Sequence, residues 1–226
     1  MKIKSYFNKI TQPQVVQIEG IKVKIPSFTS DVIRKAIYGG FYESDELQLI
    51  KSKLTQEDVV MEIGGGLGLT SAYCAKQIGN DRVFTFEANP ALEPAIKENY
   101  ALNLVEPQLE ICLVGDRSGF RDFYVGNNFW SSSIYNKAKG AKPITVPVIS
   151  FNEKVRQIDP TFLLLDIEGG EYELVEYADF HNIRKLMIEI HSCLTPEQIQ
   201  FVNNRLAQSG FHLVEAASSE EFYFER

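Results

Sequence analysis

The chain has 226 residues, a formal net charge of −7 and a hydrophobic fraction of 44%, which suits one globular α/β domain. The acidic balance disfavours a nucleic-acid substrate, because a phosphate backbone carries the same sign of charge. No stretch approaches the roughly 20 apolar residues of a membrane span. The sequence shows no signal peptide, and its three cysteines lack the spacing of metal ligands. We therefore expect a cytoplasmic protein with reduced thiols.

The first 57 residues differ in pattern from the rest and are predicted to form an extension on a larger domain. Two short apolar runs flank the turn at Glu19-Gly20. Ser30 can cap a helix that Gly39-Gly40 would end. The elements expected are strands over residues 15–18 and 21–25 and helices over residues 31–38 and 45–54.

From residue 58 onward, strand and helix patterns alternate. Strands are expected over residues 59–63, 82–86, 109–114, 162–165 and 186–190, with a final pair over 211–214 and 222–224. Helices are expected over residues 70–78, 90–102 and 171–177 and from a Thr195 cap to about residue 210. This alternation predicts a doubly wound, mostly parallel, Rossmann-like sheet covered on both faces. The predicted division is therefore an extension (1–57) and a cofactor-binding domain (58–226).

A long connection covers residues 115–159, and we expect two strands in it, over residues 121–125 and 144–149. Long connections inside compact domains are usually functional. We expect residues 127–142 to be mobile without ligand and to lie over the acceptor side of the pocket. Trp130 could stack on a sugar ring or simply anchor the loop, and the sequence leaves both open.

A glycine-rich loop follows the strand that ends near Ile63. Gly64, Gly66 and Gly68 allow a tight turn and a close approach of a ligand to the backbone. A dinucleotide fingerprint would need a further glycine where Leu69 stands. The spacing, with the acid Glu62 before it, instead resembles the first motif of S-adenosylmethionine methyltransferases.

Two acids at later strand ends extend this prediction. Glu87 ends the second strand of the domain, where an acid accepts hydrogen bonds from ribose hydroxyls in doubly wound folds. Asp116 follows the third strand and could accept from an adenine amino group, or it could be a turn residue. We expect both to contact the cofactor.

Four polar side chains follow two neighbouring strands. Asp166 and Glu168 are two residues apart after one strand, and Glu189 and His191 end the next. They should converge above the carboxyl edge of the sheet, where open α/β folds bind ligands. Such a cluster would be costly without a cation, proton sharing or substrate contacts. A sulfonium cofactor is one candidate and a metal ion another, and no metal site is assigned.

The chain resembles the FkbM family of methyltransferases over roughly residues 40–191. The resemblance rests on segments 40–43, 62–68, 86–90, 99–103, 114–119, 166–171 and 188–191, of which Asp-x-Glu-Gly-x-Glu at 166–171 is the most specific. Gly66 stands where the family often has asparagine, and Leu164 where it often has lysine, which removes a possible charged partner. The resemblance implies O-methylation of sugar or polyketide hydroxyls, and it adds Glu43 to the expected cofactor contacts.

The predicted function is therefore S-adenosylmethionine-dependent O-methylation of a sugar or similar small-molecule hydroxyl, without a nucleic-acid or membrane partner. His191 is the favoured general base because imidazole exchanges a proton near neutral pH. Asp166 is expected to contact cofactor or acceptor, and Asp166 or Glu168 is the next candidate for the base. A nicotinamide-dependent oxidoreductase and a non-catalytic cofactor-binding module are the alternatives. The oligomeric state is left open.

Overall fold

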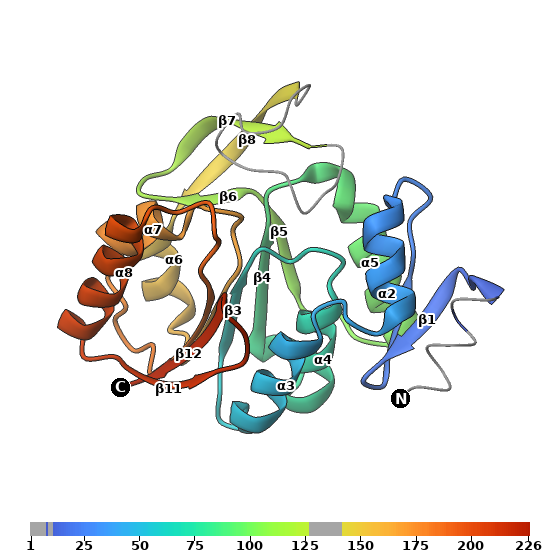
Figure 1. Cartoon of the computed structure of the whole chain (residues 1–226), viewed down its shortest axis with the longest axis horizontal. Coiled ribbons are helices and arrows are strands. Elements are labelled where there is room, and N and C mark those ends of the chain that lie inside the picture. Colours follow the sequence, from blue (N-terminus) through green and yellow to red (C-terminus); the bar gives the residue numbers. More distant parts are fainter. Residues whose placement is uncertain (1–7, 9–10, 127–141) are drawn as a thin grey trace.

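The protein is built on a seven-stranded sheet (Figure 1). The structure is a computed structural model, and it describes residue 8, residues 11–126 and residues 142–226. The order across the sheet is β11-β12-β10-β9-β3-β4-β5. The five strands from β10 to β5 are parallel, whereas β12 is antiparallel to both of its neighbours. This arrangement confirms the predicted fold class. The strands are β3 (Val60–Ile63), β4 (Val83–Glu87), β5 (Gln108–Ile111), β9 (Phe162–Leu165), β10 (Lys185–Glu189), β11 (His212–Ala216) and β12 (Glu221–Glu225).

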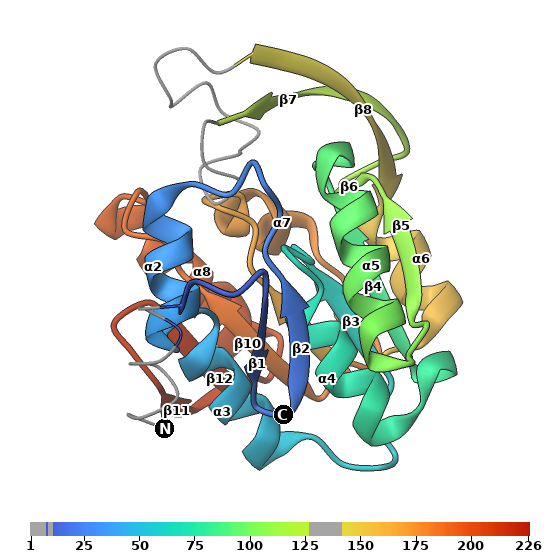
Figure 2. The same cartoon turned by 90° about the vertical axis from the view of Figure 1, so that its right-hand side faces the viewer.

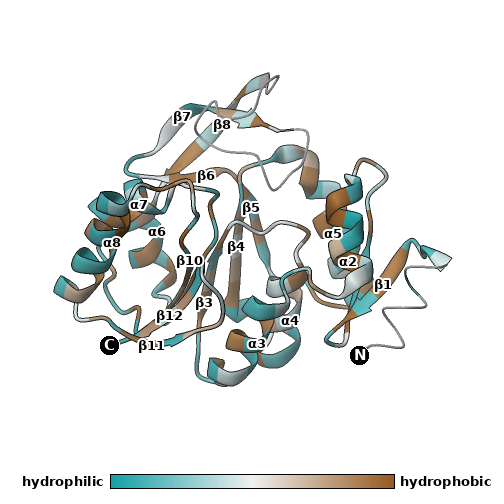
Figure 3. Ribbon diagram, viewed as in Figure 1, coloured by the Kyte–Doolittle hydropathy of each residue, from teal (hydrophilic) through white to brown (hydrophobic). Residues whose placement is uncertain are grey.

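Helices cover both faces of the sheet, and each face has its own hydrophobic core. Successive strand residues point to opposite faces, so Leu164 joins one core and Leu163 joins the other. Hydrophobic residues accordingly run along the central strands (Figure 3). One core contains residues of α3 (Ser44–Lys53), α4 (Leu69–Ile78) and α5 (Glu93–Asn103), and the other contains residues of α6 (Phe151–Ile158), α7 (Glu171–Tyr177) and α8 (Pro196–Gln208). Two short 3-10 turns, η1 (Asn80–Arg82) and η2 (Pro90–Leu92), precede β4 and α5.

The N-terminal segment forms the predicted hairpin, β1 (Val15–Ile18) and β2 (Ile21–Lys24), followed by α2 (Asp31–Gly39) with its cap at Ser30. Two asparagines of α5 hold the hairpin. The Asn99 side chain accepts from the Lys24 amide at 2.7 Å, and Asn103 accepts from the Lys22 amide at 2.8 Å. Apolar residues of the hairpin, α2 and α3 share a core with α4 and α5. The division at residue 58 stays a prediction.

The predicted third strand is divided in two. β5 ends at Ile111, and the Cys112 amide donates to the Glu87 carbonyl as the last bond to β4. β6 (Leu113–Gly115) then enters a second sheet of order β6-β8-β7, with β7 (Gly119–Val125) and β8 (Lys142–Ser150). Figure 2 shows β7 and β8 arching over one end of the main sheet.

Helix α6, in the same connection, was not predicted from the sequence. Ser150 caps it by accepting from the Glu153 amide, and Phe151 and Val155 bury one face. The expected mobile segment and Trp130 fall largely in residues 127–141, outside the described residues.

No helix in the described ranges is long and apolar enough to cross a membrane. Cys74 and Cys112 are buried, Cys193 is exposed, and none of the three is in a disulfide.

Candidate active site

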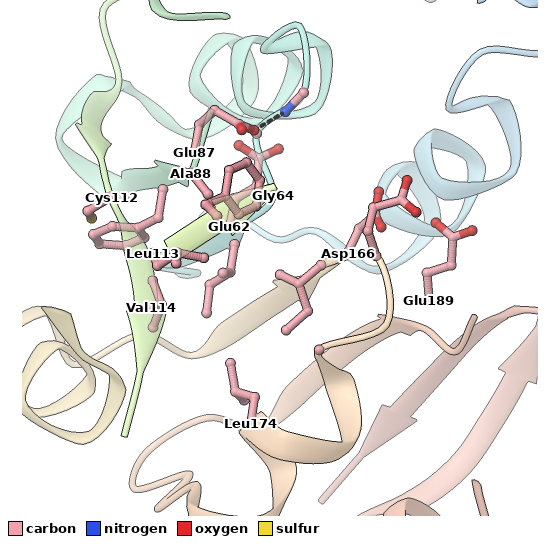
Figure 4. A pocket seen from close by; sticks show the side chains of 18 of the residues that line it. Glu62, Gly64, Glu87, Ala88, Cys112, Leu113, Val114, Asp166, Leu174 and Glu189 are labelled. Carbon is pink, nitrogen blue, oxygen red and sulfur yellow. Dashed lines mark hydrogen bonds between the residues drawn. The ribbon is translucent and has the colours of Figure 1, made fainter. Parts of the chain in front are cut away.

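A cavity of about 510 Å³ lies at the carboxyl ends of β3, β4, β9 and β10. Its volume is within the range of small-molecule and cofactor sites. Glu62, Gly64 and Glu87 lie on one side of it, and Asp166 and Glu189 lie on the other (Figure 4). The cavity therefore joins the glycine loop to the acids at the carboxyl ends of β9 and β10.

The glycine loop reaches the cavity through Gly64, Gly65 and Gly66. Gly64 has φ +99°, and a Cβ on it would lie 1.7 Å from the Asp166 carbonyl oxygen, so only glycine fits there. Gly66 has φ +52°, a conformation in which asparagine is also tolerated. Its amide donates to the Glu87 carboxylate at 2.9 Å, which ties the loop to β4.

Gly68 has a different role from the one predicted. It does not line the cavity. It caps α4 at φ +73°, and a Cβ there would lie 2.9 Å from Ile96 and from Tyr100 of α5. Gly68 thus permits the close packing of α4 on α5, and the structure does not support it as a cofactor contact.

Glu87 lies at the predicted place, at the end of β4 and against the cavity. Its carboxylate accepts from the Gly66 amide at 2.9 Å and from the Asn89 amide at 2.7 Å. Burial raises the pKa of Glu87 to about 7, although these backbone amides lower it. The carboxylate is oriented by the backbone and keeps acceptor capacity for a ligand.

Glu62 lies on the floor of the cavity and is only 3% exposed. Its cross-strand neighbour on β9 is Leu164, the position at which the resemblance to the FkbM family predicts a lysine. Leucine fills the core but offers no charge, and one Glu62 oxygen is buried with no hydrogen-bond partner among the described residues. Burial accordingly raises the pKa of Glu62 to about 8.

Glu43 reaches the cavity from the N-terminal segment, as the resemblance implies. It has φ +48° at the start of α3, and its carboxylate accepts from the Thr70 hydroxyl at 3.0 Å. The neighbouring Tyr42 hydroxyl accepts from the Leu67 amide at 3.4 Å. Burial raises the pKa of Glu43 to about 7. A strained acid held in this way against a cavity is typical of a functional position.

The Glu87 end of the cavity has apolar walls, which are formed by Ala88, Leu92, Leu113, Val114 and Phe123. Asp116 does not line it. The Asp116 side chain is 56% exposed and lies 3.7 Å from Arg117. Val114 and Gly115 line the cavity, whereas the next residue does not, so the structure does not support Asp116 as an adenine contact.

The four side chains expected to converge do so around His191. Its Nε2 atom lies 3.3 Å from a Glu168 oxygen and 3.7 Å from oxygens of Asp166 and Glu189. Its Nδ1 atom lies 2.7 Å from Glu171, which is completely buried. Parallel pairing of β9 with β10 brings the two strand ends together.

The acids change the proton affinity of His191. Burial lowers its pKa, but the hydrogen bond to Glu171 and the charges of Asp166, Glu171 and Glu189 outweigh burial and raise it to about 10. The sequence predicts His191 as a base that is free near neutral pH. A pKa raised in this way favours the protonated ring, and the role of His191 as a base stays a prediction.

Two pairings were missed from the sequence. Glu171 and Glu173 begin α7, where acids usually favour the helix dipole in solvent. Glu171 instead holds His191, and Glu173 forms a two-pronged ion pair with Arg121 of β7, at 2.5 and 3.1 Å. Arg121 and Glu173 both line the cavity. No local signal predicts either contact, since Glu173 and Arg121 are 52 residues apart.

Several solved structures of methyltransferases have a similar fold. One from Pyrococcus furiosus has a TM-score of 0.52 at 13% identity, covering 99% of this chain and 95% of that chain. Precorrin-6y C5,15-methyltransferase from Geobacter metallireducens has a TM-score of 0.51 at 13% identity, covering 81% of this chain and 88% of that chain. The tRNA (uracil-54, C5)-methyltransferase of Pyrococcus abyssi, in complex with S-adenosyl-L-homocysteine, has a TM-score of 0.53 at 10% identity, covering 94% of this chain and 44% of that chain. At these identities the likeness shows the fold alone.

No curated protein matches the chain. The Methyltransferase FkbM domain family matches residues 58–213, which is more than half of the chain and includes the glycine loop, Glu87 and the cluster around His191. This match favours a methyltransferase over an oxidoreductase or a non-catalytic module. The chain belongs to the FkbM family of methyltransferases, and the resemblance predicted from the sequence is confirmed.

Proposed function

We propose that the cavity binds S-adenosylmethionine and that the protein methylates a hydroxyl of a sugar or other small, polyketide-like acceptor. The observation that carries this proposal is one continuous cavity. At one end are the glycine loop and Glu87, and at the other are Asp166, Glu168 and His191. A cofactor site and an acid–base cluster in one cavity suit group transfer between two bound molecules.

The residues of the cavity fit this cofactor. The apolar walls at Ala88, Leu113 and Val114 suit the adenine ring, and Glu87 suits the ribose hydroxyls. Gly64 and Gly66 leave room for the amino-acid part to approach the backbone. The unpartnered oxygen of Glu62 suits its ammonium group.

Glu43 and Asp166 complete the proposed cofactor contacts. Both are acids that line the cavity near the glycine loop. Their negative charge favours a sulfonium group between them and disfavours a second anion. The same charge is the reason to propose a small neutral or cationic acceptor over a nucleic acid, whose phosphates this wall would repel.

When bound, the cofactor supplies a methyl group that moves from sulfur to the acceptor oxygen as the carbon–sulfur bond breaks. The chain must place that oxygen in line and accept its proton. We assign the proton to the cluster of Asp166, Glu168 and His191, in which His191 Nε2 lies 3.7 Å from Asp166 and 3.3 Å from Glu168. Glu168 has φ +52°, so its backbone is held in an uncommon conformation beside the acceptor.

Transfer of a labelled methyl group from S-adenosylmethionine to a panel of sugars and polyols tests the proposal. We expect a labelled methyl ether with at least one hydroxyl acceptor. Glu168→Gln and His191→Ala should each lower turnover by about 10²–10⁴ while retaining cofactor binding. Glu176→Gln, an exposed change on α7, is the matched control and should keep full activity. Methylation of only RNA or protein, or full activity in both cluster variants, would contradict the proposal.

A further inference from the structure

We propose that Asp166, Glu189 and His191 bind one divalent metal ion of the Mn²⁺ type at the acceptor end of the cavity. Each residue offers one ligand atom, and these atoms all lie within 4.8 Å of one another. All three line the cavity. The sequence assigned no metal here.

The distances between the ligand atoms suit a common ion. Two ligands bound about 2.2 Å from one ion lie about 3 to 4.4 Å apart, depending on the angle between them. His191 Nε2 lies 3.7 Å from Asp166 Oδ1 and 3.7 Å from Glu189 Oε1. Small side-chain movements would therefore close the set around an ion.

Glu171 orients the histidine for this role. Its carboxylate occupies His191 Nδ1 at 2.7 Å, which leaves Nε2 directed at the acids. Metal-binding histidines commonly give their second ring nitrogen to a carboxylate in this way, which fixes the ring and its tautomer. Glu171 Oε1 also accepts from the Gly169 amide at 3.0 Å, so the turn after β9 fixes the carboxylate in place.

Unpartnered oxygens at the cluster also favour a bound metal ion, which would displace the proton from His191 Nε2. Glu171 is 0% exposed, and its Oε2 atom is buried beside the histidine with no hydrogen-bond partner among the described residues. The Asp166 side chain is 33% exposed, but its Oδ1 atom, 3.7 Å from His191 Nε2, is also buried with no hydrogen-bond partner among the described residues. Buried carboxylate oxygens without donors are costly. The sulfonium of the proposed cofactor supplies one positive charge to a cavity that also contains Glu43, Glu62 and Glu168.

The donor set selects the type of metal. Carboxylates suit Mg²⁺, Ca²⁺ and Mn²⁺, whereas imidazole suits Zn²⁺, Fe²⁺ and Cu²⁺. A set of one imidazole and two carboxylates combines the two preferences. Among the oxygen-preferring ions, Mn²⁺ fits this set best. Three protein ligands leave coordination positions open for a hydroxyl. If the proposed function holds, an acceptor oxygen bound there would lose its proton more readily, and Glu168 would accept that proton because Asp166 and His191 hold the ion.

Titration of the metal-free full-length protein with MnCl₂, followed by the electron paramagnetic resonance signal of free Mn²⁺, tests the site without any turnover. We expect one ion per chain. Glu189→Gln and Asp166→Asn should each weaken binding by more than about 10-fold, and Glu171→Ala by about 10- to 100-fold. Glu171→Gln keeps an acceptor for His191 and should recover part of that loss. Glu176→Gln, exposed on the same helix, should bind as the wild type does.

Calorimetry with S-adenosylhomocysteine in the presence of a chelator separates this inference from the proposed function. Cofactor binding without Mn²⁺ binding overturns the metal site alone. Mn²⁺ binding that is equal in the wild type and Glu189→Gln places the ion elsewhere and also overturns it. The wild-type titration decides the matter even if a variant fails to fold. If Mn²⁺ does not bind but an amine stabilises the wild type against unfolding, the cluster binds a cationic acceptor and not a metal ion.

Discussion

The carbonyl oxygen of Asp166 lies only 1.7 Å from the point where a Cβ on Gly64 would stand. Gly64 follows β3 and Asp166 follows β9, and these strands are parallel neighbours. The Asp166 amide donates to the Ile63 carbonyl at 3.0 Å, so the contact is fixed by the sheet itself. The glycine loop and the acidic cluster therefore meet through backbone at this point.

Gly64→Ala should destabilise the fold strongly. The added carbon would meet backbone, which cannot rotate away, and Gly64 also has φ +99°. We expect a loss of more than about 3 kcal/mol in the free energy of unfolding, well above the typical effect of a point mutation. Chemical denaturation followed by circular dichroism measures it.

Gly20→Ala is the matched control. Gly20 has φ +87°, but no atom lies within 4 Å of its added carbon. In Gly20→Ala only the left-handed backbone conformation is unfavourable, which lowers the free energy of unfolding by about 1–2 kcal/mol. Equal losses in the two variants would show that the close approach to Asp166 does not matter.

Glu87→Gln should weaken cofactor binding. The carboxylate is held by two backbone amides, and the amide replacement loses charge-assisted acceptance from ribose hydroxyls. A loss of about 1.5–3 kcal/mol corresponds to roughly 10- to 150-fold in affinity for S-adenosylhomocysteine, measured by calorimetry. Glu57→Gln, exposed before β3, should bind as the wild type does. An unchanged affinity in Glu87→Gln would leave Glu87 with only the role of bracing the loop.

Glu62 should make the ligand-free protein less stable at high pH. Its folded pKa, raised by burial to about 8, lies above the ordinary 4.5, so the folded state favours the protonated form. Stability is fully present below about pH 4.5 and falls as pH rises through about 8. The nearby charges of Glu43 and Glu87 act in the same direction.

Glu62→Gln removes this titration. The variant should gain roughly 1–3 kcal/mol over the wild type at pH 9 and little at pH 5. It should also bind S-adenosylhomocysteine more weakly, because a neutral amide replaces the acid proposed to meet the ammonium group. Thermal unfolding across pH, with Glu57→Gln as the control, measures the first effect. The same gain at both pH values would exclude ionisation of Glu62 as its cause.

Most of the fold could be predicted because its signals are local. Ser30 and Thr195 cap their helices as their sequence contexts indicate, and Thr195 forms a complete capping box with Gln198. The convergence of Asp166 and Glu168 with Glu189 and His191 follows from placing their strands side by side in a parallel sheet.

The features that differ from the sequence-based predictions depend on tertiary contacts. The strand predicted over residues 109–114 breaks at Cys112 because the second half pairs with β8, about 35 residues later. Gly68 belongs to the glycine spacing but serves packing against Tyr100. Glu171 has the sequence context of a solvated first turn, and only the neighbouring strand end shows that it holds His191.

Parallel calorimetric titrations of the full-length protein with S-adenosylhomocysteine and with NAD test the central claim most directly. The cavity, with its glycine loop, Glu87 and unpartnered Glu62 oxygen, predicts one S-adenosylhomocysteine per chain and no heat of binding with NAD. Absence of S-adenosylhomocysteine binding, or tighter binding of NAD, would contradict the account.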